Sequence, residues 1–213
     1  MSFDRLAPHY TWMEAVLAGR RLQRARLAWL DRLAGAQRIL VAGVGHGPFV
    51  PACARRFPKS ELVCVDASAR MLAAARQRLG SAAANVRFIH ATLPAWTPPP
   101  ESFDAVVTHF FLDCFPPAEL REVIGLLAAA ARPEARWLVT DFAVPARGWK
   151  RQRARAIHAL MYAFFRPVTR VRAQRVTPPD ALLRAHGFAL QARRAFEWGL
   201  VQSDFWTRSA SAG

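Results

Sequence analysis

The residues in this sequence whose types and spacing could do chemistry are a glycine-rich turn and a lone acid, each at the end of an apolar run. The first run, Arg38–Ala42, leads into three alternating glycines, and the second run, Glu61–Val65, ends in Asp66. Runs of this kind are typical of buried parallel strands, and glycines let bare backbone turn sharply and approach a ligand. A carboxylate at a strand tip can accept hydrogen bonds from a ribose diol. The two features together predict a site for an adenosine-containing cofactor.

The glycine spacing helps to decide which cofactor this is. A dinucleotide fingerprint is G-x-G-x-x-G, whereas Gly43, Gly45 and Gly47 follow G-x-G-x-G and Pro48 comes next. The third glycine of the dinucleotide pattern is therefore missing. Proline suits the first turn of a helix, where its absent N–H is not needed, so we predict a helix over Pro48–Phe57.

Strand-like runs alternate with helix-like segments from residue 38 to residue 142. This alternation is typical of βαβ units that form one parallel sheet with helices on both faces, and ligands bind beyond the carboxyl ends of such strands. Ser68 fits the N-cap of the helix after Asp66. The predicted strands are Arg38–Ala42, Glu61–Val65, Val86–His90, Phe103–His109 and Arg136–Phe142, and the predicted helices are Pro48–Phe57, Ala69–Leu79 and Pro117–Ala131.

Several motifs, in order, resemble those of class I S-adenosylmethionine-dependent methyltransferases. Leu40–Gly47 is similar to the glycine-rich first motif, Val63–Ser68 to the acidic second motif, and Ser102–Asp113 to the fourth-strand motif. Phe3–Tyr10 resembles the entry segment of the quinone-biosynthesis type. The resemblance implies an α/β, Rossmann-like, doubly wound seven-stranded sheet, mostly parallel with an antiparallel last strand, and helices on both faces. The closing strands would be Ala189–Ala195 and Leu200–Thr207, after a helix over Pro179–His186.

The same resemblance implies S-adenosyl-L-methionine as cofactor and S-adenosyl-L-homocysteine as product. Two positions depart from the family pattern: Val41 stands where an acid usually precedes the first glycine, and Thr92 aligns with an aspartate near the adenine. Thr92 can still accept a hydrogen bond, but without charge. Whether these departures weaken cofactor binding stays open. The expected cofactor-binding residues are Tyr10, Gly43, Val44, Gly45, Gly47, Asp66, Ala67, Met71, Thr92, Leu93 and His109.

Methyl transfer requires the acceptor, methyl carbon and sulfur to be aligned and water to be excluded. A histidine or a carboxylate at the strand tips could assist deprotonation of an oxygen or carbon acid. His109 ends the fourth predicted strand and is the first candidate for acceptor contact or base, with Asp113 and Asp141 at neighbouring tips. The alternatives are that His109 lends only its backbone carbonyl, that Asp113 caps the helix near Pro117, and that Asp141 is a loop acid.

Length and composition predict one methyltransferase domain over residues 1–213. The sequence shows no run long enough to span a bilayer and no Cys/His grouping with zinc spacing, so we expect no metal. The three cysteines, Cys53, Cys64 and Cys114, predict free thiols in a reducing cytoplasm. The oligomeric state stays open between a monomer and a homodimer. The expected parts are an N-terminal helical cover (1–35), a cofactor-binding core (36–142), a helical substrate-cap insertion (143–187) and closing strands (188–213).

The chain carries 30 Lys and Arg against 15 Asp and Glu, a net charge of +15, and only Lys59 and Lys150 are lysines. Coding bias would explain this arginine excess, but Arg147 to Arg194 contains twelve basic residues and the single acid Asp180. A basic face can bind phosphate backbones or anionic membrane surfaces. The alternative is a solvated arginine-rich surface.

Two amphipathic segments, Trp12–Leu33 and Trp149–Arg166, are predicted to be helices that cover the active site. In the first, the arginines, Arg26 among them, are assigned to the basic side. Basic residues crowd the start of the second, the less favourable end for cations, which hints at an anion there. The aromatic residues that could wall an apolar acceptor pocket, although each alone is more often core, are Trp12, Tyr162, Phe165, Trp198 and Trp206.

These observations predict methyl transfer to a small, largely apolar or aromatic molecule, with an O-, N- or C-acceptor undetermined. One alternative is a nucleic-acid (RNA) methyltransferase that uses the basic face. Against it, the fourth motif reads Thr108-His109-Phe110-Phe111 and lacks the signature of base-amino methylation. The other alternative is a membrane-surface lipid or quinone methyltransferase that makes peripheral contact with anionic lipid.

Overall fold

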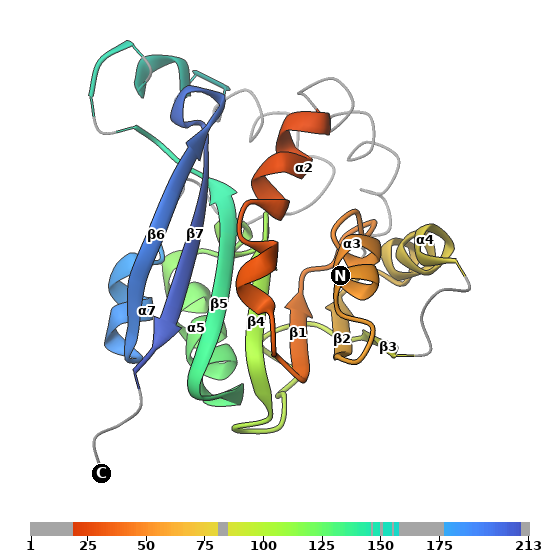
Figure 1. Cartoon of the computed structure of the whole chain (residues 1–213). Helices are drawn as coiled ribbons and strands as arrows, with labels where there is room; N and C mark the ends of the chain where they lie inside the picture. Colours follow the sequence, from red (N-terminus) through yellow and green to blue (C-terminus); the bar gives the residue numbers. More distant parts are fainter. Residues whose placement is uncertain are drawn as a thin grey trace.

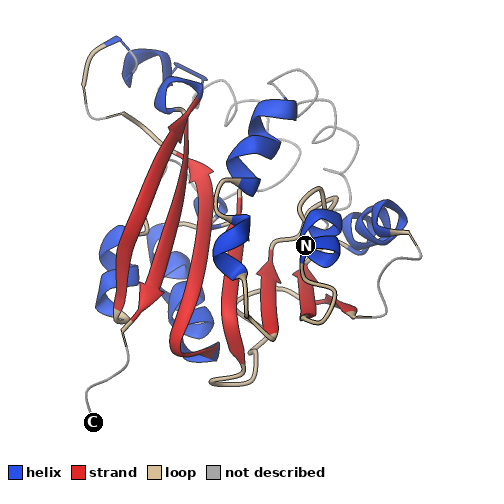
Figure 2. Cartoon of the chain, in the orientation of Figure 1, coloured by secondary structure: helices blue, strands red, loops and turns tan. Residues whose placement is uncertain are grey.

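The computed structural model describes residues 19–80, 85–145, 147–149, 151–154, 156–157 and 177–209. These residues form a seven-stranded sheet in the order β3-β2-β1-β4-β5-β7-β6. Helices lie on both sides of it (Figures 1 and 2). The strands are β1 Arg38–Ala42, β2 Glu61–Asp66, β3 Val86–His90, β4 Phe103–His109, β5 Ala131–Phe142, β6 Phe188–Phe196 and β7 Val201–Arg208.

Strands β1 to β5 pair in parallel, and β7 pairs antiparallel with both β5 and β6. The predicted fold class, including its antiparallel last strand, is confirmed. After β3 the chain crosses back over β1 to form β4, so the strand order reverses between β1 and β4. Ligands of open α/β sheets bind at such a reversal, beyond the carboxyl ends of the strands. The arrowheads of β1 and β5 mark this edge, at the top of Figure 1.

Alternate side chains of each central strand enter two different apolar clusters, as the period of two in a strand requires. Ile39 and Val41 of β1 pack beneath helices α3 and α4, whereas Leu40 and Ala42 pack beneath α5 and α7. Both faces are covered, which explains the continuous apolar runs of these strands. The helical elements are α2 Gly19–Leu27, η2 Leu30–Leu33, α3 Val50–Arg56, α4 Ala69–Leu79, η3 Leu112–Cys114, α5 Pro117–Ala130, α7 Asp180–Ala185 and η4 Glu197–Gly199.

Three elements differ from the sequence prediction by more than one residue at an end. Helix α3 begins at Val50 instead of Pro48, and Pro51 occupies its first turn. Strand β5 begins at Ala131, since α5 ends at Ala130 and the chain enters the sheet without a loop. The segment predicted as one helix over Trp12–Leu33 contains α2 and the separate 3-10 turn η2, and its first part lies outside the described residues.

The predicted helix over Trp149–Arg166 is described only at residues 149, 151–154 and 156–157, which are helical. Of the helices in the described part of the chain, none combines the length and apolar character needed to cross a bilayer.

Candidate functional site

The glycine turn after β1 is an elbow held by backbone hydrogen bonds to β2. The N–H groups of Gly43 and Val44 donate to the carbonyl of Val65 at 2.9 and 3.2 Å. Gly43, Gly45 and Gly47 have φ values of +71°, +58° and +70°, a region that side chains with a Cβ rarely adopt. All three glycines are therefore required by the turn itself.

The surroundings of the three glycines differ. A Cβ on Gly43 would lie within 2.2–2.8 Å of the Phe111 side chain, and one on Gly47 would lie 2.6 Å from the Cβ of Ala75 in α4. A Cβ on Gly45 would meet nothing within 4 Å. The elbow is thus packed against protein on two sides and leaves open space at Gly45, where a ligand could approach the backbone.

Asp66, at the end of β2, is fixed to this elbow. Its Oδ2 accepts the N–H of Gly45 at 2.7 Å and its Oδ1 accepts the N–H of Ser68 at 2.9 Å. Burial raises the pKa of Asp66, while the hydrogen bonds from Gly45 and Ser68 act in the opposite direction. Each carboxylate oxygen can accept a further hydrogen bond. The carboxylate is therefore oriented and retains capacity for two hydroxyl donors.

The start of α4 supports this arrangement. The predicted N-cap is confirmed, because the Ser68 hydroxyl accepts the N–H of Met71 at 3.2 Å. The carbonyl of Ala67 lies 3.1 Å from Nε2 of His90. The side chain of Met71, in the first turn of α4, is buried.

The two positions that depart from the family pattern lie in different environments. Val41 is 4% exposed inside the apolar cluster beneath α3, so an acid there would be buried without solvent. Thr92 is exposed, and its carbonyl accepts the N–H of Trp96 at 2.8 Å. The next residue, Leu93, is buried in the cluster beneath α5.

His109 lies at the end of β4 and is buried, with 9% exposure. Its ring meets Phe49 edge-to-face, with the centroids 4.8 Å apart, and neither ring nitrogen has a hydrogen-bond partner. Burial, and secondarily the charge of Arg26, lower the pKa of His109 well below 6.5. The imidazole is therefore neutral at physiological pH, and both of its nitrogens are buried without a hydrogen-bond partner.

Arg26 is a site residue that the sequence analysis assigned to the basic side of its helix. It is only 5% exposed, and its guanidinium lies 4.7 Å above the ring of Phe110. The signal was present, because residue 26 follows Leu22 by four, which places both on one helical face. Leu22 and Trp29 are both buried.

The structure brings Asp113 and Asp141 together. Oδ1 of Asp141 accepts the N–H of Phe111 at 2.9 Å, while its other oxygen is buried and unpartnered. The two carboxyl groups lie close enough to influence each other's charge. Burial raises the pKa of Asp113 to about 6, and burial followed by the Asp113 charge raises the pKa of Asp141 well above its usual value. The pair therefore takes up protons at a higher pH than exposed aspartates do.

The alternative interpretations of these two acids are wrong. Helix α5 has Pro116 as its N-cap, without a side-chain hydrogen bond, so Asp113 does not cap it. Asp113 lies in η3 instead, where its Oδ1 is 3.6 Å from the sulfur of Cys114. Asp141 lies within strand β5 and not in a loop.

The His109 side chain points to the opposite face of the sheet from the acid pair. His109 pairs in register with Thr140, whose hydroxyl donates to the carbonyl of Ala25 in α2 at 3.4 Å. Because side chains alternate along a strand, Asp141 faces the α5 side. The edge thus offers a neutral imidazole beside Arg26 on one face and two carboxyl groups of raised pKa on the other.

The predicted aromatic wall is not formed by the two tryptophans that the structure describes. Trp206 is fully buried in the core cluster beneath α5 and α7, and Trp198 is 57% exposed. Trp12, Tyr162 and Phe165, together with the predicted cofactor contact Tyr10, lie outside the described residues. In the described part of the chain, no group of three or more His, Cys, Asp or Glu side chains could hold a metal ion.

A doubly wound sheet with a glycine elbow after β1 and an acid at the tip of β2 defines the class I methyltransferase fold. Residues 39–134 match the family model described as a methyltransferase domain. This match, together with the relatives described below, confirms the resemblance of the motifs to class I S-adenosylmethionine-dependent methyltransferases.

Two curated relatives align with about two thirds of this chain, and the aligned part is a smaller share of each relative's own length. The ubiquinone/menaquinone biosynthesis C-methyltransferase of Syntrophotalea carbinolica is 32% identical over 147 residues, which cover 67% of this chain and 60% of the relative. A demethylmenaquinone methyltransferase of Thermus thermophilus is 31% identical over 148 residues, covering 68% and 66%. The chain thus matches less than two thirds of the length of either relative.

Solved structures share the fold at low sequence identity. The mitomycin 7-O-methyltransferase MmcR superposes with a TM-score of 0.72 at 18% identity, covering 98% of this chain and 61% of that one. A 1,6-didemethyltoxoflavin-N1-methyltransferase of Burkholderia thailandensis, with bound S-adenosylhomocysteine, gives 0.65 at 19% identity, covering 97% and 88%.

Proposed function

We propose that this chain transfers a methyl group from S-adenosylmethionine to a small, largely apolar or aromatic molecule. The observation that carries the proposal is the carboxylate of Asp66, fixed by the N–H of Gly45 beside open space at the glycine elbow. The names of the relatives support the substrate class, since they describe methyl transfer to quinone precursors, to mitomycin and to a toxoflavin precursor.

The residues present fit the cofactor. Asp66 retains acceptor capacity for the two ribose hydroxyls, and Gly45 leaves its backbone accessible to the methionyl part. Thr92, exposed beyond β3, would lie at the adenine with the backbone of Leu93. When bound, the cofactor supplies an electrophilic methyl group on a sulfonium. The remaining proposed contacts are Tyr10, Gly43, Val44, Gly47, Ala67, Met71 and the backbone of His109.

On the acceptor side, we assign the proton chemistry to the strand tips. The neutral imidazole of His109 has one unprotonated ring nitrogen, which lacks a hydrogen-bond partner and would accept the proton of an acidic acceptor that reaches it. Arg26 beside it favours an anionic form of that acceptor. Asp113 and Asp141, whose pKa values are both raised, would orient the acceptor from the other face, and Asp141 would hold Phe111 against Gly43.

Helix α2 supports the proposal that residues 1–35 cover the site. Its Gln23 side chain donates to the carbonyl of Pro48 at 2.9 Å, and so ties this helix to the glycine elbow. We propose in the same way that residues 143–187 form the substrate cap, residues 36–142 the cofactor core and residues 188–213 the closing strands. A cytoplasmic location is supported by the free, buried thiols of Cys53 and Cys64.

Calorimetry with S-adenosylmethionine and S-adenosylhomocysteine tests the cofactor, and transfer of a labelled methyl group to a panel of phenols, quinols and N-heterocycles tests the acceptor class. We expect binding of both nucleosides and label in at least one aromatic acceptor. Absence of heat and of a thermal shift with either nucleoside would reject the proposal. Label that enters only RNA would reject the small-molecule acceptor and favour the nucleic-acid alternative.

A further inference from the structure

The turn between β6 and β7 presents a tryptophan to solvent from a strained backbone. Within η4, Glu197 and Trp198 have φ values of +50° and +55°. Two consecutive residues with side chains in this region are costly, and such strain persists only where neighbouring structure enforces it. The backbone conformation of this turn is therefore enforced by the residues around it.

Contacts from three other segments hold this turn. One guanidinium nitrogen of Arg21, in α2, lies 3.1 and 3.3 Å from the two carboxylate oxygens of Glu197. Arg153 donates to the carbonyl of Glu197 at 3.4 Å. Pro145 lies so close to Gly199 that a Cβ there would be 3.0 Å from its Cγ. The backbone is fixed, while the indole at its tip stays exposed.

A second exposed tryptophan lies beside the first. Trp149 is 60% exposed, Trp198 is 57% exposed, and their ring centroids are 6.3 Å apart. Apart from these two, the only exposed large apolar side chain in the described residues is Val144, at 39%. Two adjacent exposed indoles, one of them on the fixed η4 turn, mark an interaction surface.

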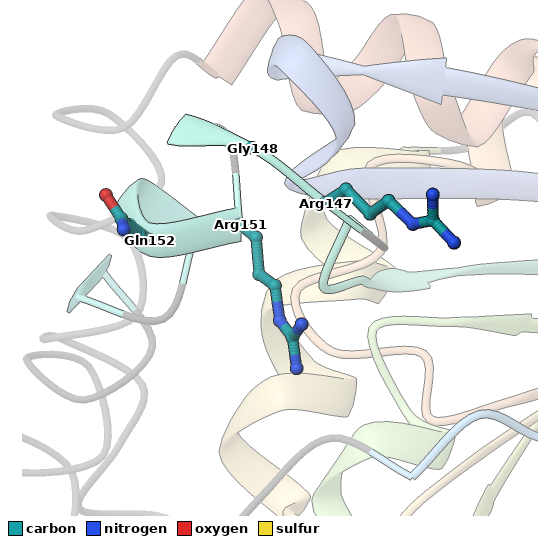
Figure 3. Close-up of a pocket in the computed structure, with 4 residues that line it drawn as sticks. All are labelled: Arg147, Gly148, Arg151 and Gln152. Atoms are coloured by element: carbon teal, nitrogen blue, oxygen red, sulfur yellow. The ribbon is translucent and has the colours of Figure 1, made fainter.

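One cation contacts the indole pair, and two more lie on the segment that carries Trp149. The guanidinium of Arg153 lies 4.6 Å above the ring of Trp198. Arg147 and Arg151 extend from the neighbouring turn and short helix, where with Gly148 and Gln152 they line a cavity of about 400 Å³ (Figure 3). The η4 turn lies at the edge where β5 ends, at the top of Figure 1.

We propose that this tryptophan–arginine surface, formed by Trp149, Trp198, Arg147 and Arg153, docks on an anionic phospholipid bilayer. Indole rings favour the headgroup region because they combine an apolar body with a polar N–H. Guanidinium groups are attracted to anionic lipid headgroups. The surface supplies both indole rings and guanidinium groups. Trp198 lies on a turn whose backbone is already fixed, so little further conformational entropy is lost there on contact.

The geometry favours a bilayer over a nucleic acid. Bases bind single-strand proteins by stacking on an open aromatic face. Arg153 already covers one face of Trp198, and Trp149 tilts toward it with an interplanar angle of 55°. One face of Trp198 is therefore closed to a stacking base, whereas insertion among lipid headgroups does not require an open ring face.

Flotation with vesicles of phosphatidylcholine, with and without phosphatidylglycerol, tests the proposal without reference to catalysis. We expect flotation of the wild type only with phosphatidylglycerol. Arg147→Gln should weaken vesicle binding about fivefold, as one basic residue near an anionic surface contributes. The double variant Trp149→Ser/Trp198→Ser should lose more vesicle binding than Arg147→Gln does. Its melting temperature should be unchanged, because both side chains are exposed.

The matched control is Arg78→Gln, which removes an exposed arginine of α4 and should float like the wild type. The proposal is overturned if the wild type does not float with phosphatidylglycerol, if the double variant floats like the wild type, or if the Arg78 variant loses as much as the Arg147 variant. It is also overturned if a single-stranded RNA oligonucleotide binds in preference to vesicles and this binding depends on the two tryptophans. None of these results touches cofactor binding, so they are distinguishable from a failure of the proposed function.

Discussion

The N–H of Gly45 donates a 2.7 Å hydrogen bond to Oδ2 of Asp66, and so joins the glycine elbow after β1 to the tip of β2. Two motifs separated by about twenty residues in the chain thereby become one structure. The bond orients the carboxylate before any ligand arrives, which lowers the entropic cost of binding.

Asp66→Ala should weaken S-adenosylhomocysteine binding by about 1–3 kcal/mol, because it removes a charged hydrogen-bond acceptor. Titration calorimetry measures this directly. Since burial raises the pKa of Asp66, affinity should fall on acidification at a higher pH than for an exposed aspartate. Asp31→Ala is the control, since its partner Arg56 is a surface residue and its own side chain is 81% exposed. Equal affinity in the Asp66 variant would remove Asp66 from the ribose site.

Gly47→Ala and Gly45→Ala should separate stability from binding. At Gly47 the new Cβ meets Ala75 at 2.6 Å in addition to the left-handed backbone, so the free energy of unfolding should fall by about 2–4 kcal/mol. At Gly45, where the Cβ meets nothing within 4 Å, only the backbone cost of about 1–2 kcal/mol applies. Urea unfolding measures both. Calorimetry measures the loss of cofactor affinity in the same two variants. The ratio of lost affinity to lost stability should be larger for Gly45→Ala than for Gly47→Ala. The reverse order of stabilities would contradict the packing described at the elbow.

His109→Leu should raise the free energy of unfolding by about 1 kcal/mol and lower turnover about 100-fold. The gain arises because leucine removes two buried, unpartnered nitrogens from an apolar contact with Phe49. Cofactor affinity should be unchanged. Because the pKa of His109 is well below 6.5, wild-type turnover should show no loss as the pH falls from 8 through 6.5. Turnover of the variant equal to wild type, with the acceptor found in the panel, would end the proposed role.

Asp141→Asn should flatten the pH dependence of stability. The folded pKa of Asp113, about 6, exceeds its ordinary value of 3.8, so the stabilisation that comes from its protonation is fully present below pH 3.8 and is lost as the pH rises through about 6. Asparagine keeps the bond from the N–H of Phe111 but carries no charge. The variant should therefore be more stable than the wild type at pH 8, on the order of 1 kcal/mol, and show no such advantage at pH 4. Denaturant unfolding at the two pH values checks this, and parallel pH curves for both proteins would refute the coupled pair.

The order of elements and the cofactor corner could be predicted from the sequence because their signals are local. Apolar runs covered on both faces predicted strands such as Phe103–His109, whose bounds the structure reproduces. Ser68 was predicted as an N-cap from its position alone. The glycine spacing likewise predicted the elbow, since a turn with positive φ requires glycine wherever it occurs.

Other features were decided by tertiary structure, because they depend on which residues meet across the sheet. Arg26 belongs with the buried residues only once α2 packs on the strand edge beside Phe110. The strand register turns Asp141 and His109 to opposite faces of the sheet, and Asp113, in η3, meets Asp141 only in the folded chain. Trp206 and Trp198 have the same chemistry, yet one lies in the core and the other in solvent. Local sequence carries propensity and pattern, whereas the burial of a charge or an indole is set by long-range packing.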